Sequence, residues 1–213
     1  MRRLPGGPHL AASVDVTDRA RCDEALGEAL AQLGTLDITV LNGHRPATSW
    51  SIFDNDLDEW RQALEVNLLG MLNVVATAST AMRTSGGGAV VTVSSMAARR
   101  VDPGILPYST TKAALEVATI GLAKELGAVG IRVNCVAPGY IDGPALRTRI
   151  ASRAKAAGFE ENSEVDRLHG ATALGRMATA DEVAEIVAFL SSRRSAPLTG
   201  VVVDANAGQW MAR

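Results

Sequence analysis

Cysteine, histidine and aromatic residues are scarce in this chain of 213 residues, which holds 2 Cys and 3 His, with Phe, Trp and Tyr together at 4%. Cys22 and Cys135 lie far apart, and neither belongs to a spacing typical of metal ligands. We therefore expect two reduced, structural thiols. The histidines are equally scattered, so no metal site is expected from them: His9, His44 and His169.

Long apolar runs and blocks of one charge are also missing. No uninterrupted apolar run approaches the ~18 residues of a membrane span, and the first residues, MRRLPGGPHL, lack the apolar stretch of a signal peptide. The formal net charge of −2 gives no electrostatic argument for nucleic acid or an anionic membrane as a partner. We therefore expect a cytoplasmic protein that binds neither.

What the chain does contain is a regular alternation of strand-like and helical segments, with an ordinary apolar content of 47%. The expected strands are residues 9–14, 37–42, 89–94, 130–136 and 200–204. The expected helices are residues 19–33, 57–83, 108–126 and 180–192. Such alternation predicts one α/β domain over residues 1–213, built on a parallel sheet.

Local signals support several of these boundaries. Gly34 is suited to end the first helix, and Thr179 with Glu182 forms a capping box at the start of the last one. Residues 1–9 are expected to be disordered. Residues 143–177 break the alternation by mixing a helical pattern with polar stretches.

Tyr108 and Lys112 form the first half of a candidate catalytic group. Residues four apart on a helix share one face, and Pro107 is well placed to open that helix. A phenol with a pKa near 10 is a poor acid or base at neutral pH, but a nearby cation favours the phenolate. Lys112 would supply that cation.

Ser95 and Asn67 supply the second half. Ser95 ends the strand-like run AVVTVSS, so its hydroxyl is expected at the carboxyl end of a buried strand, where open α/β sheets bind ligands. Asn67 lies inside a long helical pattern although asparagine is a mediocre helix former. Each residue also has a plain structural interpretation. Tyr108 and Lys112 could be an exposed helix pair, Ser95 a hydroxyl at a strand end, and Asn67 a capped or solvated amide.

Four short motifs together resemble the short-chain dehydrogenase/reductase family: VNLLG at 66–70, VSS at 93–95, YSTTK at 108–112 and VAPGYI at 136–141. The resemblance runs from about Asp15 to Gly208. It implies a Rossmann-like, doubly wound sheet that binds NAD or NADP and transfers a hydride to or from a secondary alcohol or carbonyl compound. It also implies a homo-oligomer, a dimer or tetramer, through the helices near Asn67 and Tyr108 and the strand GVVVD.

The same resemblance assigns a role to each of the four residues. Tyr108 would be the general acid/base, and Ser95 would orient the substrate oxygen. Lys112 would lower the pKa of the tyrosine and hold the nicotinamide ribose, while Asn67 would position a relay water.

Further cofactor contacts are implied at positions that match the family pattern. Asp15 matches a residue that contacts the adenine ring, although starting the next helix is an equally good interpretation of it. The other positions are Asn42, Gly43, Pro138, Gly139 and Ile141, together with Tyr108 and Lys112. His44 follows Gly43 and could reach cofactor or substrate, but we favour a structural role for it. Gly143 stands where a cofactor-binding threonine is common in the family.

The glycine-rich start of the family is absent. Relatives begin with a strand, a turn of the form T-G-x-x-x-G-x-G, a helix and a second strand, whereas Gly6 and Gly7 here have neither a strand before them nor a helix after them. The choice between NAD and NADP is therefore unreadable. The loss should leave residues 9–14 without neighbours and expose residues 37–42 as a sheet edge. A start codon placed too far downstream, a gene fragment and a genuinely short chain all fit, and we favour the first.

Two other functions compete with the oxidoreductase. One is a non-catalytic relic or interaction module that pairs with an intact paralogue. The other is a nicotinamide-independent lyase similar to halohydrin dehalogenases, which Lys112 disfavours because those proteins place arginine there.

The sequence does not identify the substrate. In the family, residues 143–177 correspond to a mobile substrate lid. Basic residues near the site and at the start of this segment are compatible with an anionic substrate, but we favour a solvated helix face: Arg99, Arg100, Arg147, Arg149, Arg153 and Lys155.

Overall fold

The computed structural model describes residues 7–46, 50–53 and 57–211. The expectation of disorder for residues 1–9 therefore falls mostly outside the described residues. Cys22 and Cys135 are both free and buried, as expected.

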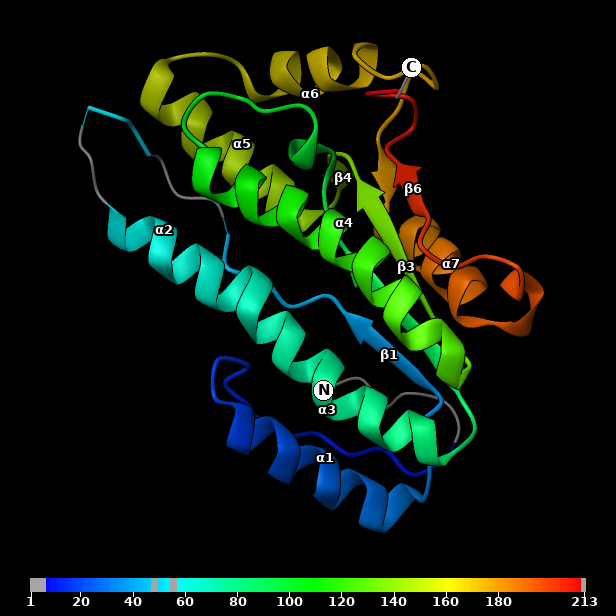
Figure 1. The fold of residues 1–213 in the computed structure, drawn as a ribbon. Helices are drawn as coiled ribbons and strands as arrows, with labels where there is room; N and C mark the ends of the chain where they lie inside the picture. Colours follow the sequence, from blue (N-terminus) through cyan, green and yellow to red (C-terminus); the bar gives the residue numbers. More distant parts are fainter. Residues whose placement is uncertain (1–6, 47–49, 54–56, 212–213) are drawn as a thin grey trace.

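A parallel sheet of four strands forms the centre of the molecule (Figure 1). Its strands are β1 (Ile38–Leu41), β2 (Gly88–Val93), β3 (Ile131–Pro138) and β6 (Val202–Ala205), in the order β1-β2-β3-β6. The runs of valine and isoleucine in β2 and β3 are buried on both faces, which is typical of parallel strands. The predicted sheet type is confirmed.

Helices cover both faces of this sheet (Figure 1). One face carries α1 (Arg19–Leu33), α4 (Leu106–Leu126) and a continuous helical run made of α2 (Leu57–Leu64), the π-helical segment η1 (Glu65–Gly70) and α3 (Met71–Thr84). The other face carries α7 (Ala180–Ser191). Successive residues of β2 serve the two cores: Val90 packs with Leu115 of α4, and Val91 packs with Leu190 of α7.

Residues 9–14 do not form the strand that we expected. Residues 8–15 run without regular secondary structure, and the described strands provide no neighbour for them. A strand needs a hydrogen-bonded partner, and the two strands that separate this segment from β1 in the family pattern are missing here. The chain is held instead by Asn73, whose amide donates to the carbonyl oxygens of Val16 (3.1 Å) and Thr17 (3.4 Å).

The predicted edge at residues 37–42 is confirmed. Strand β1 pairs only with β2 among the described strands, and Ile38 and Val40 remain 47% and 44% exposed. This edge is apolar and open.

Most helix boundaries follow the local signals. Asp18 caps α1 by accepting from the backbone N–H of Arg21, and Gly34 ends it with a positive φ of 90°. The capping box of Thr179 and Glu182 is present at the start of α7. Helix α4 begins at Leu106, two residues before Tyr108, with Pro107 in its first turn.

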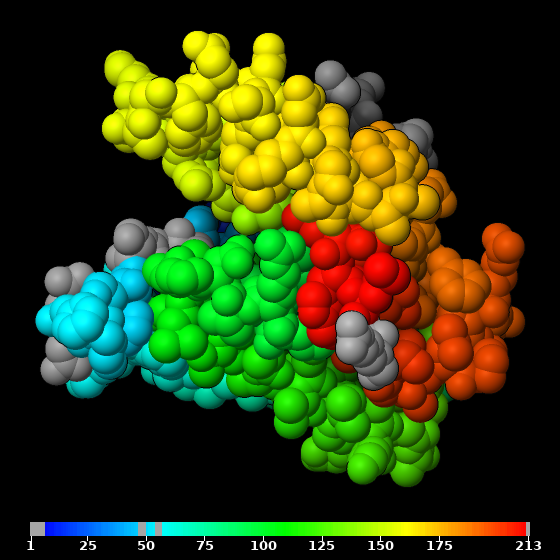
Figure 2. All heavy atoms as spheres, turned by 90° about the horizontal axis from the view of Figure 1, so that it is seen from above, coloured from blue at the N-terminus to red at the C-terminus, as the bar shows by residue number. Residues whose placement is uncertain are grey.

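Residues 143–177 fold into a small layer over the sheet. It contains α5 (Pro144–Ala157) and α6 (Glu161–Gly170), and the short parallel pair β4 (Ile141–Asp142) and β5 (Ala178–Thr179) flanks it in the sequence. Its own apolar cluster consists of Leu146, Ile150, Val165, Leu168 and Met177. Figure 2 shows this layer in yellow, with a hollow between it and the green residues at the start of α4.

The run from Leu57 to Thr84 is long and apolar enough to cross a membrane by length and composition alone. Polar residues interrupt this run, among them Asn67, Asn73 and Thr77, so it is not the uninterrupted apolar run that the expectation concerned. Met71, Val75 and Met82 of this helix nevertheless belong to the core shared with the sheet, so it occupies the place of a core helix.

Candidate functional site

Tyr108 and Ser95 meet beyond the carboxyl end of β2. Ser95 follows that strand and caps the short helix η2 (Met96–Ala98), accepting from the backbone N–H of Ala97 at 3.2 Å. Burial raises the pKa of Tyr108 above its usual value, while the hydrogen bond with Ser95 and the charge of Arg149 lower it in part. The phenol is therefore in its acid form at neutral pH.

Lys112 lies beneath the tyrosine ring. Its side chain is 3% exposed, and its Nζ donates to the carbonyl oxygen of Val93 at 2.8 Å and lies 5.8 Å from the centre of the Tyr108 ring. Burial lowers the pKa of Lys112 from 10.5 to about 8, because it disfavours the charged form.

The electrostatics of Tyr108 differ from the sequence-based expectation. We expected the Lys112 ammonium to draw the pKa of the phenol down, whereas burial dominates and the groups that lower this pKa are Ser95 and Arg149. The physical reason is placement: the ammonium lies 5.8 Å from the centre of the ring and hydrogen-bonds to Val93.

Asn67 connects three parts of the site. It is fully buried in η1, and its Oδ1 accepts from the backbone N–H of Arg45 at 2.6 Å. Its Nδ2 donates to Thr111 Oγ1 (3.2 Å) and to the carbonyl oxygen of Arg45 (3.3 Å), and Thr111 in turn donates to the carbonyl oxygen of Tyr108 at 2.8 Å. Asn67 therefore holds the loop after β1 against the first turn of α4.

Replacing Asn67 tests this bracing role. We expect Asn67→Ala to lower the free energy of unfolding by about 2–3 kcal/mol, because it removes a fully buried amide and leaves the N–H of Arg45 without its partner. Denaturant unfolding checks this. Asn73→Ala, a partly exposed asparagine on the same helical run, should cost only about 1 kcal/mol, and equal losses in the two variants would contradict the special position of Asn67.

The loop after β1 brings His44 to the tyrosine. The rings of His44 and Tyr108 lie 6.2 Å apart at an interplanar angle of 61°. Desolvation, followed by repulsion from Lys112, lowers the pKa of His44, so this imidazole is neutral at pH 7. Asn42 and Gly43 are exposed on the same loop.

Pro138, Gly139 and Ile141 lie where β3 ends. A Cβ on Gly139 would come within 2.7 Å of Gln209 Oε1 and 2.8 Å of Asn206 Cβ, so only glycine allows the chain to pass the C-terminal segment this closely. Ile141 packs against the core beside α7. Gly143 caps α5 with open space around the position of a Cβ.

Asp15 is engaged locally. Its Oδ1 accepts from the backbone N–H (2.9 Å) and the hydroxyl (2.8 Å) of Thr17, and these hydrogen bonds lower its pKa. It organises the turn before α1, whose cap is Asp18. This geometry fits the interpretation that Asp15 helps to start the next helix. The contact of Asp15 with the adenine ring remains a prediction.

Sequence reasoning missed a largely buried polar network behind the candidate catalytic group. Ser94 donates to the carbonyl oxygen of Lys112 (3.1 Å) and to Glu116 Oε1 (3.0 Å). Arg99 pairs with Glu116 (3.4 Å) and with Asp204 (2.5 Å). Burial raises the pKa of Glu116, and the charge of Arg99 opposes the shift. The only available signal was the position of Glu116, one helical turn after Lys112.

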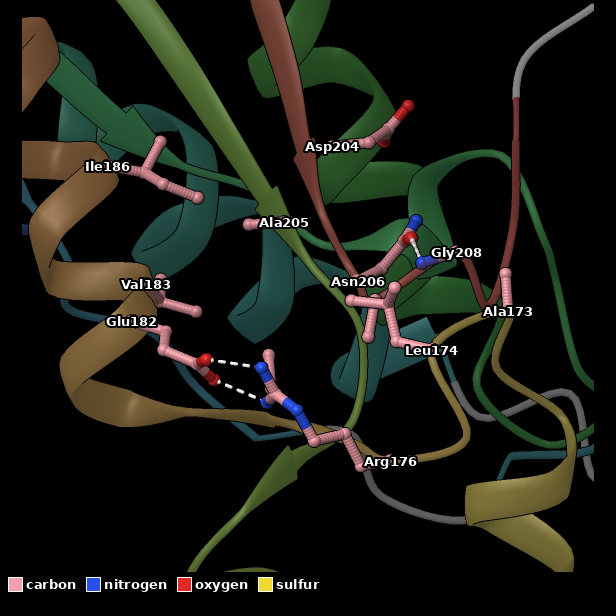
Figure 3. A pocket seen from close by; sticks show the side chains of 12 residues that line it. Ala173, Leu174, Arg176, Glu182, Val183, Ile186, Asp204, Ala205, Asn206 and Gly208 are labelled. Carbon is pink, nitrogen blue, oxygen red and sulfur yellow. Dashed lines mark hydrogen bonds and ion pairs between the residues drawn. The ribbon is translucent and has the colours of Figure 1, made fainter.

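A separate cavity of about 400 Å³ lies between α7, β6 and residues 173–176 (Figure 3). The guanidinium of Arg176 forms two hydrogen bonds to the Glu182 carboxylate, at 2.8 and 2.6 Å, across one side of it. None of its lining residues belongs to the group around Tyr108.

The fold and the group around Tyr108 define a Rossmann-like oxidoreductase, and comparisons with known proteins specify the family. The profile described as "Enoyl-(Acyl carrier protein) reductase" matches residues 3–209. An "uncharacterized short-chain type dehydrogenase/reductase y4mP" of Sinorhizobium fredii is 34% identical over 95% of this chain and 76% of its own length. A cyclohexanol dehydrogenase of Rhodococcus sp. strain TK6 is 31% identical, covering 93% and 72%.

A solved structure of a dehydrogenase is also similar to this chain. The crystal structure of NAD⁺-bound xylitol dehydrogenase superposes with a TM-score of 0.83 and 25% identity, over 91% of this chain and 76% of that one. The chain belongs to the short-chain dehydrogenase/reductase family, and its activity is oxidoreduction that depends on NAD or NADP.

Proposed function

We propose that this chain transfers a hydride between NAD or NADP and a secondary alcohol or carbonyl compound, with Tyr108, Lys112, Ser95 and Asn67 as the working residues. The observation that carries the proposal is the Tyr108 phenol, whose pKa is influenced by Ser95 at the carboxyl end of β2 and whose ring centre lies 5.8 Å from the buried Lys112 ammonium.

Each residue has a task that its surroundings suit. Tyr108 is protonated at neutral pH, so it can donate a proton to a carbonyl oxygen during reduction. The Ser95 hydroxyl bonds to the same oxygen and fixes its position. Asn67 holds the loop after β1 and the first turn of α4, and the relay water expected beside it remains a prediction.

The described residues fit the nicotinamide half of the cofactor. One of the three N–H donors of Lys112 binds the carbonyl oxygen of Val93, and the other two could donate to ribose hydroxyls. Asn42, Gly43, Pro138, Gly139 and Ile141 would line the cofactor. When bound, the nicotinamide supplies or accepts the hydride.

The described residues give the diphosphate no comparable cradle. Residues 8–15 form no strand, and the N-terminus of α1 is already capped by the carboxylate of Asp18. An anion would be repelled there. Cofactor binding by the 213-residue chain is thus the step to measure first.

The test combines cofactor titration with a pH profile. NADH and NADPH are titrated by fluorescence, and turnover of secondary alcohols and ketones is followed between pH 6 and 10. Because the pKa of Tyr108 is raised, alcohol oxidation should accelerate with rising pH as the phenolate forms. Carbonyl reduction should be fastest near neutral pH and fall above about pH 8, where Lys112 loses its charge. Binding of neither cofactor, or pH-independent rates, would contradict the proposal.

The surrounding elements would complete the enzyme. The layer of residues 143–177 would act as a substrate lid over the hollow beside α4 (Figure 2). Apolar side chains exposed on α4 and η1 would be buried in a homo-oligomer, among them Val117 (70% exposed), Ile120 (44%) and Leu69 (45%).

A second candidate function rests on the open edge of β1. An apolar groove of about 370 Å³ lies beside this strand, lined by Val14, Val16, Leu26, Leu36, Ile38 and Val40 among others. In a non-catalytic interaction module, this edge would pair with an intact paralogue. A chain that binds neither cofactor alone but co-purifies with a longer family member would favour this alternative.

A further inference from the structure

The three arginines of α5 differ in what they bind. Arg147 holds Asp142 through Nε and Nη2, both at 2.9 Å, and Arg153 pairs with Glu164 at 3.7 Å. Over the part of the chain that the structure describes, Arg149 has no carboxylate partner. The solvated helix face that we favoured from sequence therefore describes Arg147 and Arg153 better than Arg149.

Arg149 lies against the turn that follows β3. Its guanidinium carbon lies 5.4 Å from the centre of the Tyr140 ring, in the turn directly after Gly139. Its charge also acts on the Tyr108 phenol. The side chain of Arg149 is exposed. A hollow lies between the yellow layer that contains α5 and the green part of the molecule (Figure 2).

The charges around the Tyr108 hydroxyl leave Arg149 without a fixed counter-ion. His44 is neutral and Lys112 is a cation at pH 7, while Glu116 is engaged by Arg99 and Ser94. An anion that enters this hollow meets positive charge and, among the described residues that contact Tyr108, no carboxylate.

We propose that the substrate is a hydroxy acid or keto acid whose carboxylate binds Arg149 while its hydroxyl or carbonyl oxygen lies between Tyr108 and Ser95. The inference rests on the proposed function and deepens it, because it names the substrate class of the same site. The planar guanidinium donates in a fork that matches a carboxylate, and such charge-assisted hydrogen bonds fix orientation as well as affinity. A substrate held at both ends presents its reacting carbon in one pose only.

The test uses pairs of substrates in which the negative charge of a carboxylate is removed by a methyl ester. The probes are the 2-, 3- and 4-hydroxycyclohexanecarboxylates and their methyl esters, each oxidised with NAD or NADP. We expect the wild-type chain to prefer at least one acid over its ester by about ten- to a hundredfold in kcat/KM. Arg149→Gln should bring that ratio close to one, and Arg149→Lys should restore part of it.

Arg147→Gln is the matched control. It removes the same charge from the same helix, but its guanidinium already binds Asp142, so the acid-to-ester ratio should stay at the wild-type value. Ratios that are equal in the wild-type chain and in Arg149→Gln would overturn the inference, and so would an equal drop in both variants.

Failure of the proposed function is distinguishable from failure of this inference. If the chain oxidises neither acids nor esters, the oxidoreductase mechanism fails first. Calorimetric titration with the same hydroxy acids then tests whether Arg149 binds their carboxylate. Binding that is lost in Arg149→Gln supports the inference. No binding to the wild-type chain, or binding that is unchanged in the variant, overturns it.

Discussion

Tyr108→Phe should lower kcat for both alcohol oxidation and carbonyl reduction by about 10³-fold while leaving the fold intact. The substitution removes the proton that the phenol donates or accepts, and a positioned acid–base group contributes typically 10²–10⁴ in rate. The ring stays in place above Lys112. Loss of the hydrogen bond to Ser95 should change the free energy of unfolding by about 1 kcal/mol. Steady-state kinetics and denaturant unfolding check the two parts separately.

Ser109→Ala is the control for this variant. Ser109 is the next residue of α4, and its buried hydroxyl has no hydrogen-bond partner within the described part of the chain. Its removal should leave the rate within about twofold and should not lower the stability. A rate for Tyr108→Phe close to that of the wild-type chain would remove Tyr108 from the mechanism.

Lys112→Met should abolish most activity and make the protein more stable at pH 7. The ammonium is 3% exposed, and its pKa falls from 10.5 to about 8, a difference of about 2.5 units that corresponds to a cost of about 3 kcal/mol. Losing the hydrogen bond to Val93 offsets about 1 kcal/mol of this. We expect a net gain of about 1–2 kcal/mol, together with a weaker affinity for the cofactor and a rate at least about 10²-fold lower.

The pH dependence of this gain identifies its cause. Below about pH 8 the folded wild-type chain carries the buried charge, so the advantage of methionine is largest there. Between pH 8 and 10.5 the unfolded chain binds the extra proton, the wild-type stability rises with pH, and the advantage should shrink. Lys124→Met, on the exposed end of the same helix, should show neither effect. A stability gain that is independent of pH would contradict this account.

The parts of the molecule that were predictable from sequence depend on local patterns. Helix α1 covers Arg19–Leu33 as expected, because Asp18 and Gly34 mark its ends. Tyr108, Lys112 and Ser95 come together because one helical face and one strand end define their positions. Asn67 was identified as unusual for a helix, but its partners Arg45 and Thr111 were not, since they depend on how distant segments pack.

The parts that were not predictable depend on contacts between residues distant in sequence. Arg99 and Asp204 are 105 positions apart, and no spacing rule connects them. The same limit applies to α5, where three arginines look alike in sequence and only the folded chain separates Arg149 from its paired neighbours. Residues 9–14 failed as a strand for the related reason that strand formation needs a partner.

The two buried cysteines provide a pair of internal reporters of local opening. Burial raises the pKa of both thiols, so neither is reactive in the closed molecule. Cys22 lies on α1 beside the open edge, whereas Cys135 is fully buried in the central strand β3. An alkylating reagent reaches Cys22 once α1 lifts from α3, but it reaches Cys135 only when the sheet itself comes apart. The order in which the two thiols are labelled therefore distinguishes fraying at the edge from global unfolding.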